Sequence, residues 1–383
     1  MENKQPLGGR LLTGPFVFLL ALFLAGVYVA ARRFLFGLGA VTNMNDGYPW
    51  GIWIALDVVV GTAFACGGYV MALLTYAFNK MEYHPLMRPA LLTSLFGYSL
   101  AGVSVILDIG RYWHAYNIIL PWHSNLHSVM FEVAVCIGAY VLVLWIEFAP
   151  TVLEKLKAER LLKKLNRLLF VFIALGILLP TMHQSSLGTM MLMAGYKLSP
   201  LWRTAFLPLL FLLTALVIGF AIVIYESLFS SLVYDQPLET PVLSKLAAVI
   251  VWCLLLFMVI RVEDVNLRGY LPLAFNGSLV SDMFLLENTL LLAGLLLLIY
   301  PANRRSPRLL FLAATCLLLG GGLYRFDTYV TGFDPGNGWH YFPSAGEIIV
   351  TLGIVSLEIM AYIWCLKRLP VFGGRVPAAG LQD

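Results

Sequence analysis

FLPLLFLLTALVIGFAIVIYESLFS, residues 206–230, is an apolar run whose single charged side chain is Glu226. A helical run of about 18 apolar residues or more is long enough to cross the ~30 Å hydrocarbon core of a bilayer. Similar runs recur along the chain, separated by prolines and by turn residues such as Asn45, Asp46 and Gly47. The pattern therefore predicts a series of membrane-spanning helices.

The composition supports this interpretation. The 383 residues are 60% hydrophobic and 12% charged, whereas soluble domains have about 45–50% apolar and about 25% charged residues. This excess excludes a soluble enzyme, a disordered chain and a nucleic-acid-binding protein. We predict an all-α polytopic membrane protein, a single integral membrane domain over residues 1–383. Its ten predicted spans are 15–36, 51–78, 88–110, 127–149, 168–190, 206–230, 244–262, 281–300, 308–329 and 346–367.

The distribution of Lys and Arg predicts the orientation of the spans. With the N-terminus in the cytoplasm, about two thirds of the 25 Lys and Arg residues fall on the inner side. The loop 150–167 carries most of this bias, so both termini are predicted to be cytoplasmic. The predicted segments are an N-terminal segment 1–14, spans one to four in 15–149, the basic loop 150–167, spans five and six in 168–230, spans seven to ten in 244–367, and a tail 368–383.

The predicted outer loops are rich in Tyr, Trp, Asn and Gly. They are residues 37–50, 111–126, 191–205, 263–280 and 330–345. Aromatic side chains gather at membrane–water interfaces, so these loops are either interfacial belts or a docking face for a protein on the outer side.

The cysteines and histidines do not form a metal-binding pattern. The five cysteines lie singly in apolar runs, so no iron–sulfur or zinc site is expected. A b-type haem in a bilayer needs two facing axial histidines. Of the six histidines only His183 lies clearly inside a span, with His127 at a margin. We therefore expect neither haem nor metal in this chain, and any electrons must come from a partner and leave on a diffusible carrier.

Ionisable side chains inside spans are costly and are candidates for function. They are Asp57, Asp108, Glu132, His183, Glu226, Glu287, Arg325, Asp327 and Glu358. Glu287 and the pair Arg325 and Asp327 are interpreted as satisfied interhelical pairs, and Glu147 and Glu347 as solvated groups at the interface.

Some of these residues, together with further polar ones, are concentrated near the outer ends of spans two, three and four. This group contains Asp57, Asp108, Arg111, Glu132 and His127. Asp57 is expected to share one helix face with Trp50 and Trp53. This common depth predicts a polar pocket under the outer surface. A proton relay needs titratable groups at successive depths in the membrane. The sequence offers such groups at Tyr98, Glu132, His183 and Glu226.

Several motifs resemble a known family. Residues 49–57 (PWGIWIALD), 94–100 (SLFGYSL) and 108–113 (DIGRYW) resemble the NrfD/PsrC-type, polysulfide reductase-like membrane subunits. Further segments are similar to the membrane subunits of periplasmic hydrogenase-2 type [NiFe] uptake hydrogenases. These segments are 84–86 (HPL), 147–150 (EFAP), 179–186 (LPTMHQSS) and 341–344 (YFPS). The family often has proline where this chain has Tyr112, which affects the rim of the predicted pocket.

The resemblance implies a fold and a function. Family members have two four-helix bundles, to which this chain adds two helices, and they bind menaquinone or ubiquinone near the periplasmic face without haem. It implies an inner-membrane protein that docks a periplasmic ferredoxin-like iron–sulfur subunit, and through it the [NiFe] small and large subunits, and that serves the quinone pool of the lipid bilayer. We expect menaquinone rather than ubiquinone.

We assign residues to two roles on this basis. The predicted quinone contacts are Trp53, Asp57, Asp108, Arg111, Asn125 and His127. The predicted proton route is Tyr98, Glu132, His183 and Glu226, which would be the catalytic contribution of this chain to hydrogen:quinone oxidoreduction.

Two other functions remain open from the sequence. A pure membrane anchor would only tether a redox complex. A proton-coupled secondary transporter would use the same buried charges. Transporters usually have midplane spans interrupted by Gly or Pro in corresponding halves, whereas most prolines here fall at span ends.

Overall fold

The computed structural model describes residues 6–234 and 239–371, and these are almost entirely helical. Residues 1–5 of the predicted N-terminal segment and 372–383 of the predicted tail lie outside the described residues. Ten helical segments of the described chain are long and apolar enough to cross a membrane, as predicted. The chain is therefore a multi-pass membrane protein.

The spans follow one another along the chain with short connections. They are α1 (Gly14–Phe36), the segmented span Trp53–Ala77, η4 with α4 (Met81–Leu86 and Met87–Asp108), α5 (Val129–Lys155), α6 (Glu159–Met193), α7 (Leu207–Tyr234), α8 (Thr240–Leu267), α9 (Leu279–Ile299), α10 (Pro307–Tyr329) and α11 (Ala345–Arg368).

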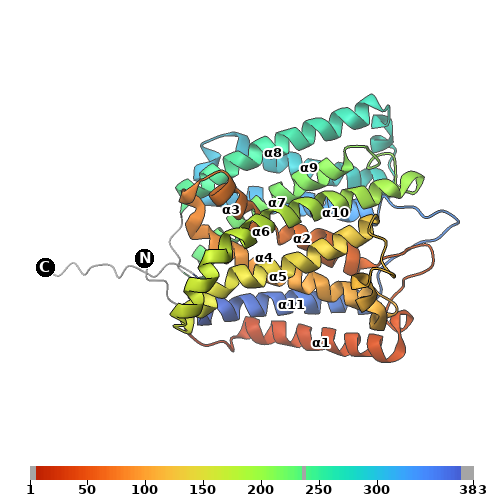
Figure 1. Cartoon of the computed structure of the whole chain (residues 1–383). Helices are drawn as coiled ribbons and strands as arrows, with labels where there is room; N and C mark the ends of the chain where they lie inside the picture. Colours follow the sequence, from red (N-terminus) through yellow and green to blue (C-terminus); the bar gives the residue numbers. More distant parts are fainter. Residues whose placement is uncertain (1–5, 235–238, 372–383) are drawn as a thin grey trace.

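The helices form two four-helix bundles and one additional pair, as the resemblance implied. In the first bundle the span Trp53–Ala77 contacts α4 and α6, and α5 packs against both of these helices. In the second bundle α7 contacts α8 and α10, and α9 packs against both of these helices. The two bundles meet where α7 contacts α6 and α3. The first and last helices, α1 and α11, pack against each other along one side of the molecule (Figure 1).

The two ends of the molecule differ. Segments 37–52, 109–128 and 330–344 lie at the end that we call the loop end, on the right in Figure 1. The described ends of the chain lie at the opposite end, where the Leu7 N–H donates to the Leu366 carbonyl at 3.1 Å. Both described ends of the chain therefore lie on one side of the bundle, and the cytoplasmic location of that side remains a prediction.

The predicted basic loop 150–167 is mostly helical. Helix α5 continues through Pro150 to Lys155, and α6 begins at Glu159, so only residues 156–158 connect them. The basic residues that follow in α6 sit on exposed turns of a long helix. The apolar run sets the span but not the helix end, because polar turns outside the bilayer continue the same hydrogen-bond ladder.

The second span is an interrupted helix. It has wide π-helical turns at Trp53–Val60 (η2) and Leu73–Ala77 (η3), around the short α-helices α2 (Gly61–Phe64) and α3 (Gly67–Ala72). At the break, Ser94 of α4 donates to the Ala65 carbonyl at 2.5 Å and accepts from the Gly68 N–H at 2.8 Å. Irregular backbone is tolerated at membrane depth only where protein groups satisfy it, and α4 supplies these groups.

Arg325 of α10 stabilises the same span. Its guanidinium is fully buried and donates to the carbonyls of Val59, at 3.1 Å, and Phe211, at 2.5 Å. Asp327 instead accepts from Thr331 at 2.6 Å. The predicted pairing of Arg325 with Asp327 is therefore wrong, because residues two apart on a helix point to different sides.

A buried ion pair lies in the second bundle. Arg261 of α8 donates to Glu287 of α9 at 2.9 Å, and the two side chains are 1% and 0% exposed. The indole N–H of Trp202 also donates to Glu287, at 3.2 Å, and Arg261 donates to the Leu201 carbonyl at 2.6 Å. The expectation that Glu287 belongs to a satisfied pair is confirmed.

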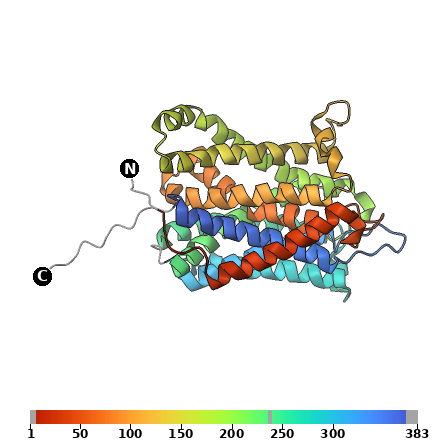
Figure 2. The same cartoon turned by 90° about the horizontal axis from the view of Figure 1, so that it is seen from below.

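Two glycines let α1 and α11 cross closely. A Cβ built on Gly353 would lie 2.9 Å from the Gly26 Cα, and one built on Gly26 would lie 3.0 Å from the Gly353 Cα. Figure 2 shows the oblique crossing of the two helices. Small residues at such crossings let helix backbones approach in a membrane.

Gly353→Leu is expected to separate α1 from α11 and to destabilise the subunit by about 1–3 kcal/mol, because the new side chain has no space at the crossing. Thermal unfolding of the purified protein in detergent measures this effect. Gly102→Leu is the matched control, since a Cβ at Gly102 meets nothing within 4 Å. Equal unfolding temperatures for the two variants would contradict the prediction.

Candidate functional site

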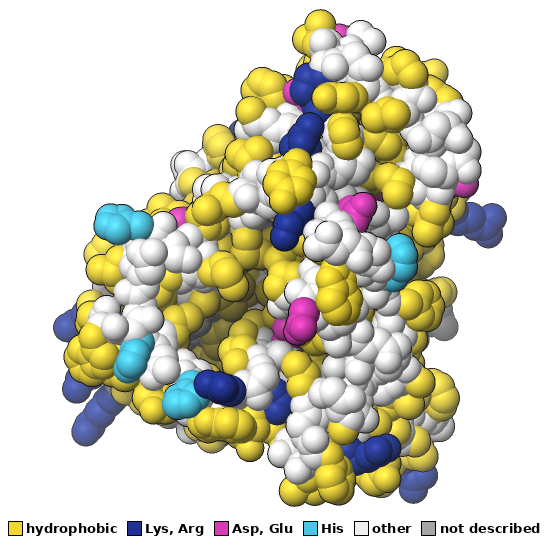
Figure 3. Space-filling model, turned by 90° about the vertical axis from the view of Figure 1, so that its right-hand side faces the viewer, with side chains coloured by type: hydrophobic (Ala, Val, Ile, Leu, Met, Phe, Trp, Pro, Cys, Tyr) yellow, Lys and Arg dark blue, Asp and Glu magenta, His cyan; other side chains and the backbone are white. Residues whose placement is uncertain are grey.

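A cavity of about 830 Å³ opens at the loop end. Its walls come from the loop before the second span, the end of α4 at the loop end, the loop 109–128, the start of α5 and Met190 of α6. The space-filling view of this end shows a hollow near its centre (Figure 3). Pockets for drug-sized ligands have volumes of about 300–1,000 Å³ and combine apolar walls with a few polar groups, and this cavity fits that description.

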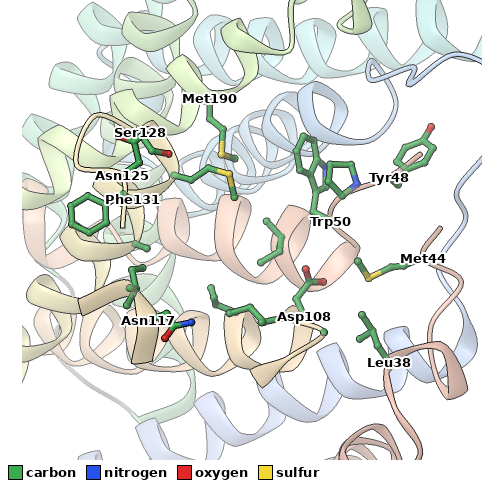
Figure 4. A pocket seen from close by; sticks show the side chains of 18 of the residues that line it. Leu38, Met44, Tyr48, Trp50, Asp108, Asn117, Asn125, Ser128, Phe131 and Met190 are labelled. Carbon is green, nitrogen blue, oxygen red and sulfur yellow. The ribbon is translucent and has the colours of Figure 1, made fainter. Parts of the chain in front are cut away.

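Asp108 is the buried carboxyl group of the cavity. It ends α4, is only 8% exposed, and points into the same space as Trp50 and Met190 (Figure 4). Its Oδ1 accepts from the Gly51 N–H at 3.4 Å, and the Trp50 indole is held by its N–H bond to the Tyr329 carbonyl at 3.0 Å. The cavity thus combines an aromatic wall with an acidic group.

Tyr48 adds a second aromatic ring to the wall. Its hydroxyl donates to the Phe333 carbonyl at 3.2 Å. Burial, and then the nearby Asp334 carboxylate, raise the pKa of Tyr48. The phenol therefore stays protonated and keeps this bond.

The cation nearest to the Asp108 turn is Arg33, which the sequence analysis did not single out. Arg33 is 1% exposed and donates from Nε to the Leu107 carbonyl at 2.7 Å and from Nη2 to the Ile109 carbonyl. It also interacts electrostatically with Asp108. The only sequence signal was an arginine inside the last turn of an apolar run, which does not indicate the partner helix.

The predicted cation Arg111 lies elsewhere. It is exposed beside a shallow hollow with His114 and Asn117. Asn125 lines the main cavity, and its Oδ1 accepts from the His127 N–H at 3.0 Å. The His127 side chain is exposed at the loop end. Of these predicted contacts, the structure brings Asp108 and Asn125 to the cavity and leaves Arg111 and His127 on the surface near it.

Trp53 and Asp57 share one helix face, as predicted, but this face points toward α11. The Trp53 indole donates to the Glu347 carbonyl at 3.1 Å, and Asp57 accepts from Thr351 at 3.2 Å and from Ser104 at 3.1 Å. Trp50 faces Tyr329 instead, so it does not share this face. The reason is that Trp50 precedes the helix, which begins only at its π-helical turn.

The interpretation of Glu347 as a solvated group is wrong. Glu347 is fully buried, and it closes a capping box with Ser344 at the start of α11. It also accepts from the Tyr341 hydroxyl at 2.5 Å and from the Asn43 N–H at 3.0 Å. Burial and the bond to Glu347 raise the pKa of Tyr341, which therefore remains a donor. Glu147 is also partly buried, with Oε1 against Gly176.

The four predicted relay residues do not form one continuous chain of contacts, and only two of them contact each other. Tyr98 and His183 meet in the first bundle, where the hydroxyl lies 2.8 Å from Nε2, and Gln184 donates to the same hydroxyl at 3.2 Å. Glu132 accepts from Ser186 of α6 at 2.7 Å, so it lies near this contact without joining it. Glu226 lies across α4, where it accepts from Thr93.

One of the six histidines lies in the core of a bundle. All six lie in the described residues, and His183 is the one at the centre of a bundle, with Nε2 bonded to Tyr98 and Nδ1 buried without a partner. The others lie at the two ends of the molecule. Within residues 6–234 and 239–371, no three His, Cys, Asp or Glu side chains gather as metal ligands.

Comparison with known proteins identifies the family. Residues 40–333 match the family described as polysulphide reductase, NrfD. The chain belongs to the NrfD family. The matched region contains both four-helix bundles and excludes α1 and α11, so this NrfD protein carries the family fold plus one added helix pair.

Three curated relatives extend over nearly the whole chain. The Escherichia coli (strain K12) "Probable Ni/Fe-hydrogenase 2 b-type cytochrome subunit" is 44% identical over 97% of this chain and 95% of its own. The Nitratidesulfovibrio vulgaris "Menaquinone reductase, integral membrane subunit" is 28% identical over 93% and 90%. A selenate reductase subunit of Mesobacillus selenatarsenatis is 21% identical over 88% of both chains. This NrfD protein is therefore similar to membrane subunits of redox complexes.

Proposed function

We propose that this chain is the quinone-reactive membrane subunit of a periplasmic [NiFe] hydrogenase. It receives electrons from a ferredoxin-like iron–sulfur subunit docked at the loop end. That subunit in turn receives them from the small and large hydrogenase subunits. It delivers them to menaquinone in the cavity around Asp108. The chain lies in the inner membrane with the loop end periplasmic.

The observation that carries this proposal is the cavity itself. It opens at the end where the aromatic-rich loops lie, and its one buried acid stands beside Trp50. The named functions of the relatives, a hydrogenase 2 subunit and a menaquinone reductase subunit, agree with a quinone-linked role. The exposed loop 109–128 around the opening, with Trp113, Trp122 and three histidines, offers a surface for the electron donor.

The residues of the cavity suit quinone chemistry. Two-electron reduction of a quinone also takes up two protons. Asp108 is placed to give a proton or a hydrogen bond to a carbonyl oxygen, and Arg33 fixes the end of α4 that carries it. Trp50, Met44 and Phe131 supply apolar walls for the ring and for the start of an isoprenoid tail.

We also propose that the chain works without haem, because His183 is the one histidine among the buried side chains of the described residues. An optical spectrum of the purified subunit tests this point, and the expected result is no b-type haem band. Haem bands at one equivalent per chain would contradict it, and would agree with the name of the Escherichia coli relative.

Filling the cavity tests the proposed function. Ala134 of α5 lines the cavity, so Ala134→Phe is expected to lower H2-dependent reduction of a menaquinone analogue by about tenfold or more, because a phenyl ring occupies the site. The assay uses membranes with the intact complex. Reduction of an artificial dye by the hydrogenase subunits should remain unchanged.

Gly138→Phe is the matched control. Gly138 lies one turn further along α5, and a Cβ there meets nothing within 4 Å. Its quinone reduction should equal that of the wild type. If the wild-type complex reduces dye but no quinone, the chain is a pure anchor and the proposal fails.

A further inference from the structure

A second cavity, which we call the acid groove, lies between the second span, α4, α7 and α11. Its volume is about 590 Å³. Three carboxyl groups line it, from Asp57, Glu226 and Glu358, and its other walls are mostly apolar. The proposed quinone reaction does not account for this cavity.

The three carboxyl groups lie at successive depths. On α11, Thr351 beside Asp57 and Tyr362 near the inner end of the groove are about 16 Å apart at 1.5 Å rise per residue. Glu358 lies between them. Glu226 of α7 lies toward the inner end, where it accepts from Thr93. The groove therefore extends from the inner end of α7 to Asp57 and to Ala101 of α4, about two turns before the end of α4.

The outer end of the groove approaches the quinone cavity. Asp57 accepts from Ser104, which lies one turn before Asp108 on α4. Asp57 and Asp108 also interact electrostatically. The two cavities thus lie on either side of the Asp57–Ser104 contact.

The lining contains no positive charge. None of the 22 residues that line the groove is Lys, Arg or His, and all lie in the described chain. An ionised carboxylate in apolar surroundings without a counter-charge is expensive, so such groups exchange protons rather than hold a fixed charge. Structural ion pairing, which explains Glu287, does not explain these three acids.

Gly97 shapes the middle of the groove, and Tyr362 shapes its inner end. Gly97 leaves room for Glu358, because a Cβ at that position would lie 3.2 Å from its Oε1. The buried hydroxyl of Tyr362 interacts with the hydroxyls of Thr93 and Ser230, which line the groove with it. Since a water in a cavity occupies about 30 Å³ and seeks polar partners, the volume of the groove and the carboxyl and hydroxyl groups of its lining suit a file of waters between the acids.

We infer that the acid groove conducts protons from the inner face to the quinone cavity, by way of Glu226, Glu358 and Asp57. The inference rests on the proposed function and names its proton source. Electrons arrive from the partner at the loop end, two protons arrive through the groove, and the quinone becomes the quinol. The central residue lies on α11, outside the residues that match the family.

The experiment uses right-side-out membrane vesicles that contain the intact complex, a pH indicator inside and a menaquinone analogue in the membrane. In the wild type, H2 should cause quinone reduction together with alkalinisation of the interior, which a protonophore abolishes. Glu358→Gln should lower interior alkalinisation about tenfold or more, since its amide cannot relay a proton. Glu358→Asp should restore much of the loss, and dye reduction by the hydrogenase should not change.

Two further variants keep the test decisive. Glu226→Gln, at the inner end, should give the same loss if Glu358→Gln fails to assemble. Glu147→Gln is the matched control, because Glu147 is a partly buried acid of α5 that does not line the groove. It should alkalinise the interior as the wild type does.

The outcomes separate the inference from the proposed function. Wild-type alkalinisation in both Glu358→Gln and Glu226→Gln overturns the route, and the groove is then only a lipid-facing cleft. Loss of alkalinisation in Tyr98→Phe, with none in Glu358→Gln, assigns the route to the Tyr98–His183 contact instead. A wild type that reduces dye but no quinone refutes the proposed function itself.

Discussion

Asp108→Asn is expected to reduce H2-dependent quinone reduction by about 100-fold, the lower end of what a positioned general acid contributes. The amide can still accept from the Gly51 N–H, and Arg33 donates to backbone carbonyls rather than to Asp108. The variant should therefore fold and assemble, and it loses only the acidic proton in the cavity. Quinone reduction by membranes containing the intact complex measures the effect.

The control for this prediction is Asp334→Asn. Asp334 lies at the same end of the molecule, in a loop where it accepts from the Gly336 N–H at 2.8 Å, and it does not line the cavity. Its quinone reduction should match the wild type, and dye reduction should be unchanged in both variants. An Asp108→Asn enzyme as fast as Asp334→Asn would remove Asp108 from the reaction.

Glu287→Ala is expected to destabilise the protein by about 3–5 kcal/mol, because it leaves a buried guanidinium without its carboxylate. Arg261 would keep only the Leu201 carbonyl, and the Trp202 indole would lose its acceptor. Unfolding of the purified subunit in detergent, followed by heat or by a denaturing detergent, measures the change.

The double variant Arg261→Met/Glu287→Leu should be much less destabilised than Glu287→Ala, since both members of the ion pair are removed and neither charge is left without its partner. Glu263→Ala is the control for loss of an acid, because Glu263 is an exposed residue of α8, the helix that carries Arg261. If Glu287→Ala unfolds at the temperature of Glu263→Ala, the ion pair contributes little to stability.

The fold was largely predictable because span length and hydrophobicity are properties of the sequence alone. All ten spans are present, and the additional pair is α1 with α11. The ends were less predictable. Proline at 150 was interpreted as the end of a span, yet α5 continues through it for another turn. A proline inside a helix removes one i→i−4 hydrogen bond while the other bonds of the turn remain, so it does not by itself fix the boundary.

The candidate site was only partly predictable, because depth follows from sequence but helix rotation does not. Asp108 and Asp57 have similar depths, yet one faces the loop-end cavity and the other faces α11. The interpretation of Glu347 was also wrong. Its position near the interface suggested a solvated group, whereas Glu347 is buried in a capping box and accepts from Tyr341. Such contacts depend on a helix that is distant in sequence, and nothing local indicates them.

The added pair joins the first helix of the chain to the last. Helix α1 packs mainly against α11 and is otherwise surrounded by the bilayer. During synthesis α1 therefore waits in the lipid until the final span has been inserted, and until then Glu226 has no α11 beside it. A chain truncated before residue 345 would present both an unpaired helix and a lipid-exposed acid. The fold is complete only once α11 has been inserted, which gives the cell a simple mark for discarding chains that lack this helix.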